Sequence, residues 1–212
     1  MQVILASASQ GRLRVLRAAG LDPLVEVSDV DEDALLATLR HAPPARVVTA
    51  LACAKAGAVA ERAALRTAEA VVIGCDSMLS VDGELIGKPG TEDAARRRWA
   101  ALAGRTGQLV TGHAVLRLAD GAVTEVAAGH AGTSVHFGSP SEAELDAYLA
   151  SGEPLHVAGG FTLDGLGGWF VMGIEGDPSN VIGISLPLTH KLLTDVGIRV
   201  TDLWQRQPAE EG

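Results

Sequence analysis

The stretch AVVIGCDSMLSV, residues 70–81, predicts a buried β-strand. Its apolar run is continuous, and its first half is rich in β-branched residues, as is typical of a strand covered on both faces. Asp76 interrupts this run. A buried carboxylate is costly unless it is paired, binds a metal or faces a cleft, so Asp76 is the first candidate for chemistry. The alternative is a strand-end aspartate that bonds to neighbouring amides.

The flanking segments predict alternating strands and helices. Residues 3–7 predict a short strand, after which Ser9 caps a helix that ends near Ala19. The pairs Asp82-Gly83 and Asp120-Gly121 predict tight hairpin turns. Because hairpins interrupt the alternation, we expect an α/β fold with a mixed sheet flanked by helices. Further strands are expected over 24–27, 108–118, 122–136 and 169–176, and further helices over 45–66, 91–103, 141–150 and 185–197.

Length and composition limit the class of protein. The 212 residues fit one domain, or two closely joined lobes, over 1–204, with a polar tail over 205–212. A net charge of −9 argues against nucleic-acid binding, although a local basic pocket stays compatible with it. The chain has no apolar run long enough for a membrane span and no basic leader for secretion. Cys53 and Cys75 form no zinc or disulfide pattern, which favours a reduced, cytoplasmic protein.

Two of the chain's lysines stand out, because arginine outnumbers lysine by 14 to 3. Lys55 lies in the long Ala-rich helix, where a solvated face is the alternative interpretation. Lys88 lies in GELIGKP, which fails as a Walker A loop because the glycine spacing is short and proline follows the lysine.

Two further segments could contact phosphate or metal. In SASQGR, Ser7 and Ser9 stand at a helix N-terminus after a strand, and Arg12 adds a bidentate donor. An ordinary helix cap followed by a surface arginine is the alternative. The acidic loop DVDED, residues 29–33, could supply oxygen ligands to magnesium or manganese, or could be a solvated turn before a helix.

The order of these motifs resembles the Maf family over residues 3–197. The resemblance rests on LASAS, LACAKA, GCDS, IGKP, LAGRTGQLVTGHAVL, SGEPLHVAGGFTLDGLGG and NVIGISLPL. It implies a nucleoside triphosphate pyrophosphatase with an elongated mixed sheet and two lobes around a cleft, similar to inosine triphosphate pyrophosphatases. It also implies a homodimer and a divalent metal, Mg²⁺ or Mn²⁺.

The resemblance assigns roles to particular residues. Asp76 matches the family's catalytic acid, as general base or metal ligand, and Lys55 and Lys88 match its phosphate-binding lysines. Asp31 or Glu32 corresponds to the family's acidic pair, expected at the metal. Ser7, Ser9 and Arg12 match its N-terminal signature, expected at the substrate.

Three positions depart from the usual family pattern and leave the preferred base open. Many members read SPRR where this chain has Gly11 before Arg12, ADT where it has Ser77 after Asp76, and IQG where it has Asp164. These positions resemble places where members that prefer different bases diverge, so Ser77 and Asp164 are expected at the substrate. His156 stands near a position where family patterns carry lysine.

Two other functions fit parts of the pattern. A nucleotide-binding regulator of division or stress, with little or no catalysis, would keep the phosphate contacts but gain little from a carboxylate facing phosphate. A phosphatase that releases orthophosphate stepwise is the second alternative. Metal-dependent release of pyrophosphate would distinguish an enzyme from a regulator, and the identity of the released phosphate would distinguish a pyrophosphatase from a phosphatase.

Overall fold

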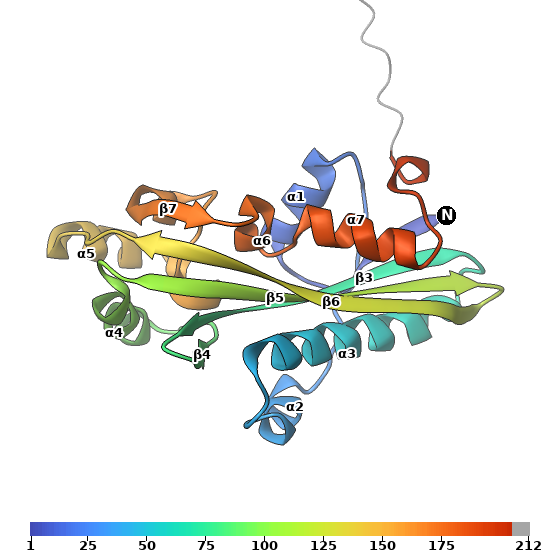
Figure 1. Cartoon of the computed structure of the whole chain (residues 1–212), viewed down its shortest axis with the longest axis horizontal. Coiled ribbons are helices and arrows are strands. Elements are labelled where there is room, and N and C mark those ends of the chain that lie inside the picture. Colours follow the sequence, from blue (N-terminus) through green and yellow to red (C-terminus); the bar gives the residue numbers. More distant parts are fainter. Residues whose placement is uncertain (205–212) are drawn as a thin grey trace, which may run out of the picture.

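A computed structural model describes residues 1–204, which form one twisted seven-stranded sheet (Figure 1). The strand order is β2-β1-β3-β5-β6-β7, and β4 pairs with the outer end of β3. Strands β1, β2 and β3 run parallel, whereas β4, β5, β6 and β7 join antiparallel, so the predicted mixed sheet is confirmed. The strands are β1 (Gln2–Leu5), β2 (Leu24–Val25), β3 (Ala70–Val81), β4 (Glu84–Ile86), β5 (Thr106–Ala119), β6 (Ala122–Phe137) and β7 (Val171–Glu175).

Helices cover both faces of this sheet. On one face, α1 and α7 pack Leu16 and Leu192 against the strands, and on the other face α3 packs Ala56 and Val59 (Figure 1). The predicted flanking by helices is therefore confirmed. The α-helices are α1 (Gln10–Ala18), α2 (Glu32–Thr38), α3 (Pro44–Ala64), α4 (Glu92–Leu102), α5 (Glu142–Ala150), α6 (Pro178–Ile182) and α7 (Leu186–Asp195).

A separate core fills the other end of the elongated sheet. It centres on Trp99 of α4, which meets Phe137, Tyr148 and Phe170 edge-on with ring centroids 5.8–5.9 Å apart. The long strands β3 and β5 contribute to the cores at both ends. The molecule thus has two halves that share one sheet.

Most expected elements are present within a few residues of their predicted ends. The strand over 70–81 matches β3, and both Asp-Gly hairpins form, with positive φ of 52° at Asp82 and 53° at Asp120. Ser9 caps α1, and Ser141 with Glu144 forms a capping box on α5. The polar tail predicted over 205–212 lies outside the described residues.

Two expectations need correction. The acidic segment is not only a loop, because α2 begins at Glu32. The glycine-rich stretch contains three short 3-10 helices, and the third of them takes the first two residues of the predicted strand over 169–176. Of the two cysteines, Cys75 is fully buried and Cys53 is half-buried. The 3-10 helices are η1 (Glu153–His156), η2 (Ala158–Gly160), η3 (Leu166–Phe170) and η4 (Val200–Asp202).

Candidate active site

A short stretch of β3 lacks a neighbouring strand on one side. Strand β1 pairs with β3 only as far as Ile73, and β4 begins to pair at Leu79, so residues 74–78 pair with β5 alone. The carbonyl of Ile73 accepts from the Ala6 amide at 2.8 Å on the β1 side. Because backbone polar groups alternate sides along a strand, those of Cys75 and Ser77 face the same opening. Asp76 and Ser77 therefore stand where the sheet edge is interrupted.

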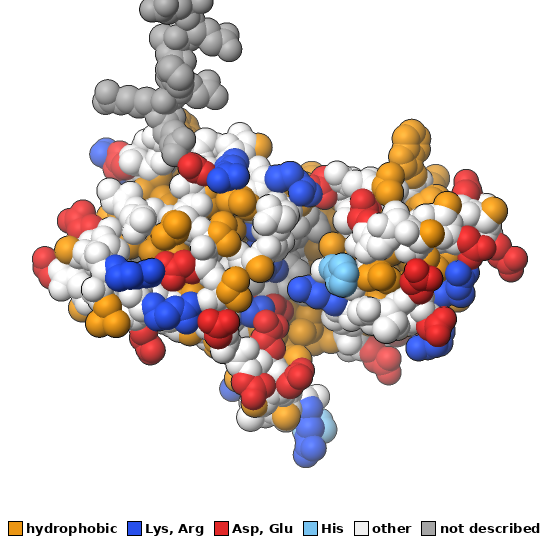
Figure 2. All heavy atoms as spheres, turned by 180° about the vertical axis from the view of Figure 1, so that it is seen from behind, with side chains coloured by type: hydrophobic (Ala, Val, Ile, Leu, Met, Phe, Trp, Pro, Cys, Tyr) orange, Lys and Arg blue, Asp and Glu red, His pale blue; other side chains and the backbone are white. Residues whose placement is uncertain are grey.

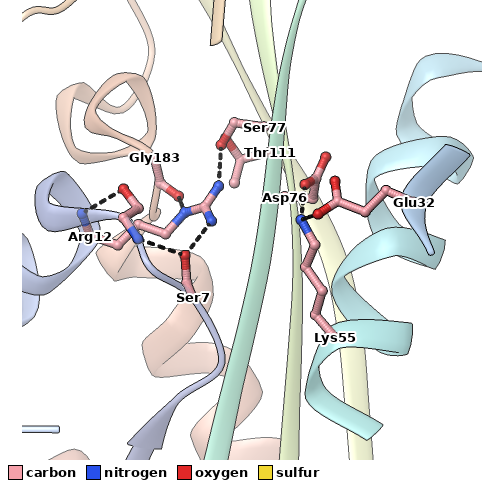
Figure 3. A network of polar contacts seen from close by, with 9 residues as sticks. Ser7, Arg12, Glu32, Lys55, Asp76, Ser77, Thr111 and Gly183 are labelled. Atoms are coloured by element: carbon pink, nitrogen blue, oxygen red, sulfur yellow. Dashed lines mark hydrogen bonds and ion pairs between the residues drawn. The ribbon is translucent and has the colours of Figure 1, made fainter. Parts of the chain in front are cut away.

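On the α3 face of this opening, Lys55 holds two carboxylates. Its Nζ lies 2.6 Å from Oδ1 of Asp76 and 2.9 Å from Oε1 of Glu32 (Figure 3). Lys55 is only 9% exposed and Asp76 only 7%, so the solvated-face interpretation of Lys55 is wrong. Burial makes this pairing important, because an isolated charge at such a position would be strongly penalised.

Two glycines bring α3 close enough to make this contact. A Cβ on Gly74 would lie 2.5 Å from the carbonyl oxygen of Ala52, and one on Gly112 only 2.1 Å from that of Val48. Both distances are impossible for real atoms, so the helix backbone rests directly on β3 and β5 at these positions. Lys55, one turn beyond Ala52, consequently reaches the Asp76 carboxylate from above the sheet.

On the opposite face of β3, Arg12 is buried within a ring of oxygen acceptors. Its Nη1 donates to Ser7 Oγ at 2.8 Å, and its Nη2 donates to Ser77 Oγ at 3.1 Å (Figure 3). Its Nε donates to the carbonyl of Gly183 at 2.8 Å. All these partners are neutral, and no carboxylate pairs with Arg12 in the described part of the chain. The guanidinium, only 8% exposed, therefore keeps an uncompensated positive charge beside the opening.

A second layer of buried polar groups fixes this ring. Ser77 Oγ shares a hydrogen bond of 2.9 Å with Thr111 Oγ1, and Thr111 also donates to the carbonyl of Asn180 at 3.4 Å. His113, fully buried on β5, accepts from the Ser185 amide through Nε2 at 2.8 Å. Burial, reinforced by the charge of Arg12, lowers the pKa of His113 to about 4, so this imidazole is neutral.

Three of the predicted substrate residues lie outside these contacts. Ser9 caps α1 by accepting from the Arg12 amide. Lys88 is exposed in the loop after β4, with no ion pair among residues 1–204. Asp164 pairs with Arg14 of α1 at 2.6 Å, which joins the glycine-rich segment of one half to the other half.

Of the two predicted acidic ligands, only Glu32 reaches the Asp76 cluster. Asp31 instead caps α2, with its Oδ1 accepting from the Ala34 amide at 2.9 Å. No group of three or more His, Cys, Asp or Glu side chains within 1–204 could form a ready-made metal cage. Asp76 and Glu32 nevertheless converge on one cationic position, now taken by the Lys55 ammonium. Two carboxylates are the usual protein share of a Mg²⁺ site that is completed by water and phosphate oxygens.

The sequence did not single out Thr111, His113, Asn180 or Gly183 as site residues. The only signal for them was their place in the segments TGHAVL and NVIGIS. The sheet register and the docking of α6 bring them to Arg12, so no local pattern reveals them. Figure 2, which shows the face opposite to that of Figure 1, has a hollow between the two halves, with acidic and basic side chains gathered beside it.

These features define a class of protein. A buried arginine without a counter-ion attracts an anion such as phosphate, while the carboxylate of Asp76 on the other face of the same strand is suited to accept a proton. The molecule is thus an α/β protein with a candidate anion site at Arg12 and a candidate general base at Asp76. In residues 1–204, no helix has the length and apolar character needed to cross a bilayer.

Comparison with known proteins identifies the family. The family model described as Maf-like protein matches residues 2–196, and the chain belongs to this family. A protein of Nocardia farcinica is 62% identical over 208 residues, covering 98% of each chain, and one of Saccharopolyspora erythraea is 61% identical, covering 96% of this chain and 97% of the other. Both are named nucleoside triphosphate pyrophosphatases.

A comparison of structures finds a weaker similarity. The Ham1 protein of Staphylococcus aureus matches with a TM-score of 0.37 and 17% identity, covering 65% of this chain and 72% of that one. This similarity is too low to bear on the chemistry of the site.

Proposed function

We propose that the protein hydrolyses nucleoside triphosphates, standard or modified, between the α- and β-phosphates. One water is consumed, and the products are the nucleoside monophosphate and pyrophosphate. The relatives named above carry this activity in their names and match nearly the whole chain. The observation that carries the proposal is the placement of Arg12 and Asp76 on opposite faces of β3 at the same open stretch.

In this proposal Asp76 is the general base. Lys55 engages only its Oδ1, and no donor within residues 1–204 engages the other oxygen, Oδ2. That oxygen is placed to accept a proton from the attacking water. The water oxygen then bonds to the α-phosphorus while the bond from that phosphorus to the bridging oxygen breaks, and pyrophosphate leaves with the electron pair.

Cationic groups of the chain neutralise the triphosphate in this scheme. Arg12 binds phosphate oxygens, which act as its counter-ion, and Lys88, exposed in the loop after β4, supplies a further positive charge. Asp76 and Glu32 would hold Mg²⁺ or Mn²⁺, which supplies further charge neutralisation when bound. In the structure the Lys55 ammonium occupies the position between these two carboxylates and limits their mutual repulsion, so a bound metal would displace it.

Assembly and location complete the proposal. We infer a homodimer, which is supported by the family resemblance. The free thiols Cys53 and Cys75 are compatible with a reducing compartment, so we place the protein in the cytoplasm.

The decisive experiment measures phosphate products with and without Asp76. The wild type, given a panel of nucleoside triphosphates and Mg²⁺, is expected to release pyrophosphate and monophosphate in equal amounts. Asp76→Asn, which preserves shape, is expected to lose this turnover by at least about 10²-fold while keeping its circular dichroism spectrum. Retained turnover in Asp76→Asn would refute the role of Asp76. Orthophosphate as the first product would favour a stepwise phosphatase, and nucleotide binding without turnover in the wild type would favour a regulator.

A further inference from the structure

One ion pair joins the two halves of the molecule outside the sheet. The first half contains α1, α3 and α7, and the second contains α4, α5, β7 and the glycine-rich stretch. Nη2 of Arg14, on α1, lies 2.6 Å from Oδ2 of Asp164, in the glycine-rich stretch. No other ion pair among residues 1–204 links the helices of the first half to the second half. Arg14 and Asp164 therefore hold α1 to the second half by a charge-assisted hydrogen bond.

Helix α1 contacts the candidate anion site and the second half through different residues. With 3.6 residues per turn, Arg12 and Arg14 are about 200° apart around the helix axis and point in nearly opposite directions. The Arg12 side chain is buried among the oxygen acceptors of the site, whereas the Arg14 side chain is 61% exposed. Because both side chains belong to one short helix, the Arg14 contact also determines where Arg12 lies relative to the second half.

The second half holds Asp164 through η1. Glu153, the first residue of η1, accepts from Thr162 Oγ1 at 2.6 Å and from the Gly167 amide at 3.0 Å. These two hydrogen bonds lie on either side of Asp164 in the sequence, so they fix the turn that carries it. The position of Asp164 is therefore determined by the second half.

The same short helix also holds the loop of Lys88. The Gly90 amide, two residues beyond Lys88, donates to the Leu155 carbonyl of η1 at 3.0 Å. Lys88 therefore belongs to the second half, whereas Arg12 belongs to the first. A triphosphate that binds to both cations must lie between the halves, so the distance between the halves decides whether it meets one cation or two.

We propose that Arg14 and Asp164 are positioning residues of the pyrophosphatase. By holding α1 to the second half, their ion pair keeps Arg12 and Lys88 close enough to bind the same triphosphate. This role rests on the function proposed above and adds two residues that act without touching the substrate. Asp164 then acts through Arg14, and not at the substrate as the sequence predicts.

The expected effect is small for the loss of one charge and larger for its reversal. The Arg14 and Asp164 side chains are 61% and 27% exposed, so solvent screens their attraction. Asp164→Asn should therefore raise KM for triphosphate by about 2- to 5-fold. Asp164→Arg places two guanidinium groups opposite each other and should raise KM by about 10-fold or more. Saturating triphosphate bridges the two phosphate-binding cations and restores the closed arrangement, so kcat should change by less than about 2-fold.

Exchange of the two charges tests the ion pair itself. Arg14→Asp combined with Asp164→Arg rebuilds the pair in reverse and should return KM to within about 3-fold of the wild-type value. If the double variant keeps the raised KM of Asp164→Arg, the ion pair does not position the cations and the proposal is wrong. That result would also follow if Asp164 bound the substrate directly.

Asp146→Arg is the matched control. Asp146 pairs with Arg96 at 2.6 Å within the second half, and the substitution changes the net charge by the same amount as Asp164→Arg. KM should keep its wild-type value in this control, and urea denaturation should show that all variants are folded. An equal rise of KM in Asp146→Arg would show that surface charge is responsible, and would overturn the proposal.

Removal of Lys88 tests the route by which the ion pair acts. In a Lys88→Ala background, Asp164→Arg should raise KM by no more than about 2-fold, because the second cation is already absent. The same rise of KM in both backgrounds would show that the ion pair does not bring Lys88 to the triphosphate, which would refute the positioning role.

Spin labels measure the separation of the halves independently of hydrolysis. The labels are placed at Ala18→Cys, exposed on α1, and at Met172→Cys, 75% exposed on β7. Cys53→Ser removes the half-buried thiol, and Cys75 is fully buried. Pulsed electron resonance should show a longer or broader distance distribution in Asp164→Arg, and the charge exchange should restore the wild-type distribution.

The assays separate the two levels of the proposal. If the wild type releases no pyrophosphate from any triphosphate, the proposed function is wrong, whatever the label distances are. If the wild type is active but Asp164→Arg has wild-type label distances and a wild-type KM, only the positioning role of Arg14 and Asp164 is wrong.

Discussion

Acid should destabilise this protein through His113, which is buried as a neutral imidazole. The side chain has no exposed surface, and its Nε2 accepts from the Ser185 amide, a bond that protonation would abolish. Burial first, and then the charge of Arg12, lower the pKa of His113 from 6.5 to about 4, against smaller opposing effects of the hydrogen bond to the Thr111 carbonyl and of Asp177. In the unfolded chain the His113 imidazole is therefore protonated below about pH 6.5, whereas in the folded chain it is protonated only below about pH 4.

The sign and size of the effect follow from this difference in pKa. Stability from His113 is complete above pH 6.5, falls as the pH drops toward 4 and levels off below that. Between pH 7.5 and pH 5.0, the free energy of unfolding should fall by about 2 kcal/mol because of this residue alone. Urea denaturation at the two pH values, followed by circular dichroism, measures the loss.

His113→Gln isolates this contribution, because glutamine can accept a hydrogen bond but does not titrate. The five other histidines and all carboxylates remain in both proteins, so their effects cancel in the comparison. The wild type should lose about 2 kcal/mol more than the variant between the two pH values. Equal losses in the two proteins would show that His113 is protonated or solvated in the folded state, contrary to its position.

Three other substitutions test single contacts. Gly112→Ala would push α3 away from the sheet at the Val48 carbonyl and should lower the free energy of unfolding by about 1–3 kcal/mol in urea denaturation. Gly57→Ala is the control, because Gly57 has open space around it, and this variant should be neutral or stabilising. Equal effects of the two substitutions would contradict the close packing of α3 on β5. Arg12→Lys keeps the positive charge but loses the planar, bidentate donor group of the guanidinium, so KM for triphosphate should rise by about 10-fold or more. An unchanged KM would show that Arg12 does not bind phosphate. Glu153→Gln weakens the hydrogen bonds that the carboxylate accepts from the Leu166 and Gly167 amides, both at 3.0 Å. Hydrogen exchange of these two amides should therefore be faster in the variant. Unaltered exchange would show that other contacts hold the glycine-rich segment.

Local sequence signals predicted much of the fold. The β-branched run of β3 has no competing helical period, so its limits at residues 70 and 81 could be predicted. An Asp-Gly pair favours a tight turn by its local conformation alone. The capping box of α5 likewise needs only Ser141 and Glu144, which lie within four residues of sequence. The three 3-10 helices of the glycine-rich stretch, η1, η2 and η3, could not be predicted. They depend on tertiary hydrogen bonds, such as those that Glu153 accepts from the amides of Leu166 and Gly167.

The candidate site was predictable in its types of residue but not in its arrangement. Asp76 was visible as a charge within an apolar strand, and Lys55 as an uncommon residue type. The burial of Lys55 was not visible, because it results from the contact of α3 with Gly74 and Gly112. The sequence also could not show that Asp76 and Ser77 lie at an open stretch of the sheet, since this depends on where β1 and β4 stop pairing with β3.

The bond from Arg12 to the Gly183 carbonyl spans 171 residues of sequence. Synthesis on the ribosome proceeds from the N-terminus, so Arg12 is made before α6. The hydrogen bond from Arg12 to the Gly183 carbonyl can form only after α6 has been made. A nascent or prematurely terminated chain that lacks this segment would contain Asp76, Lys55 and Arg12 yet hold the guanidinium loosely. If Arg12 binds phosphate as proposed, chains that end before α6 should bind triphosphate weakly and should not sequester the cell's nucleotides.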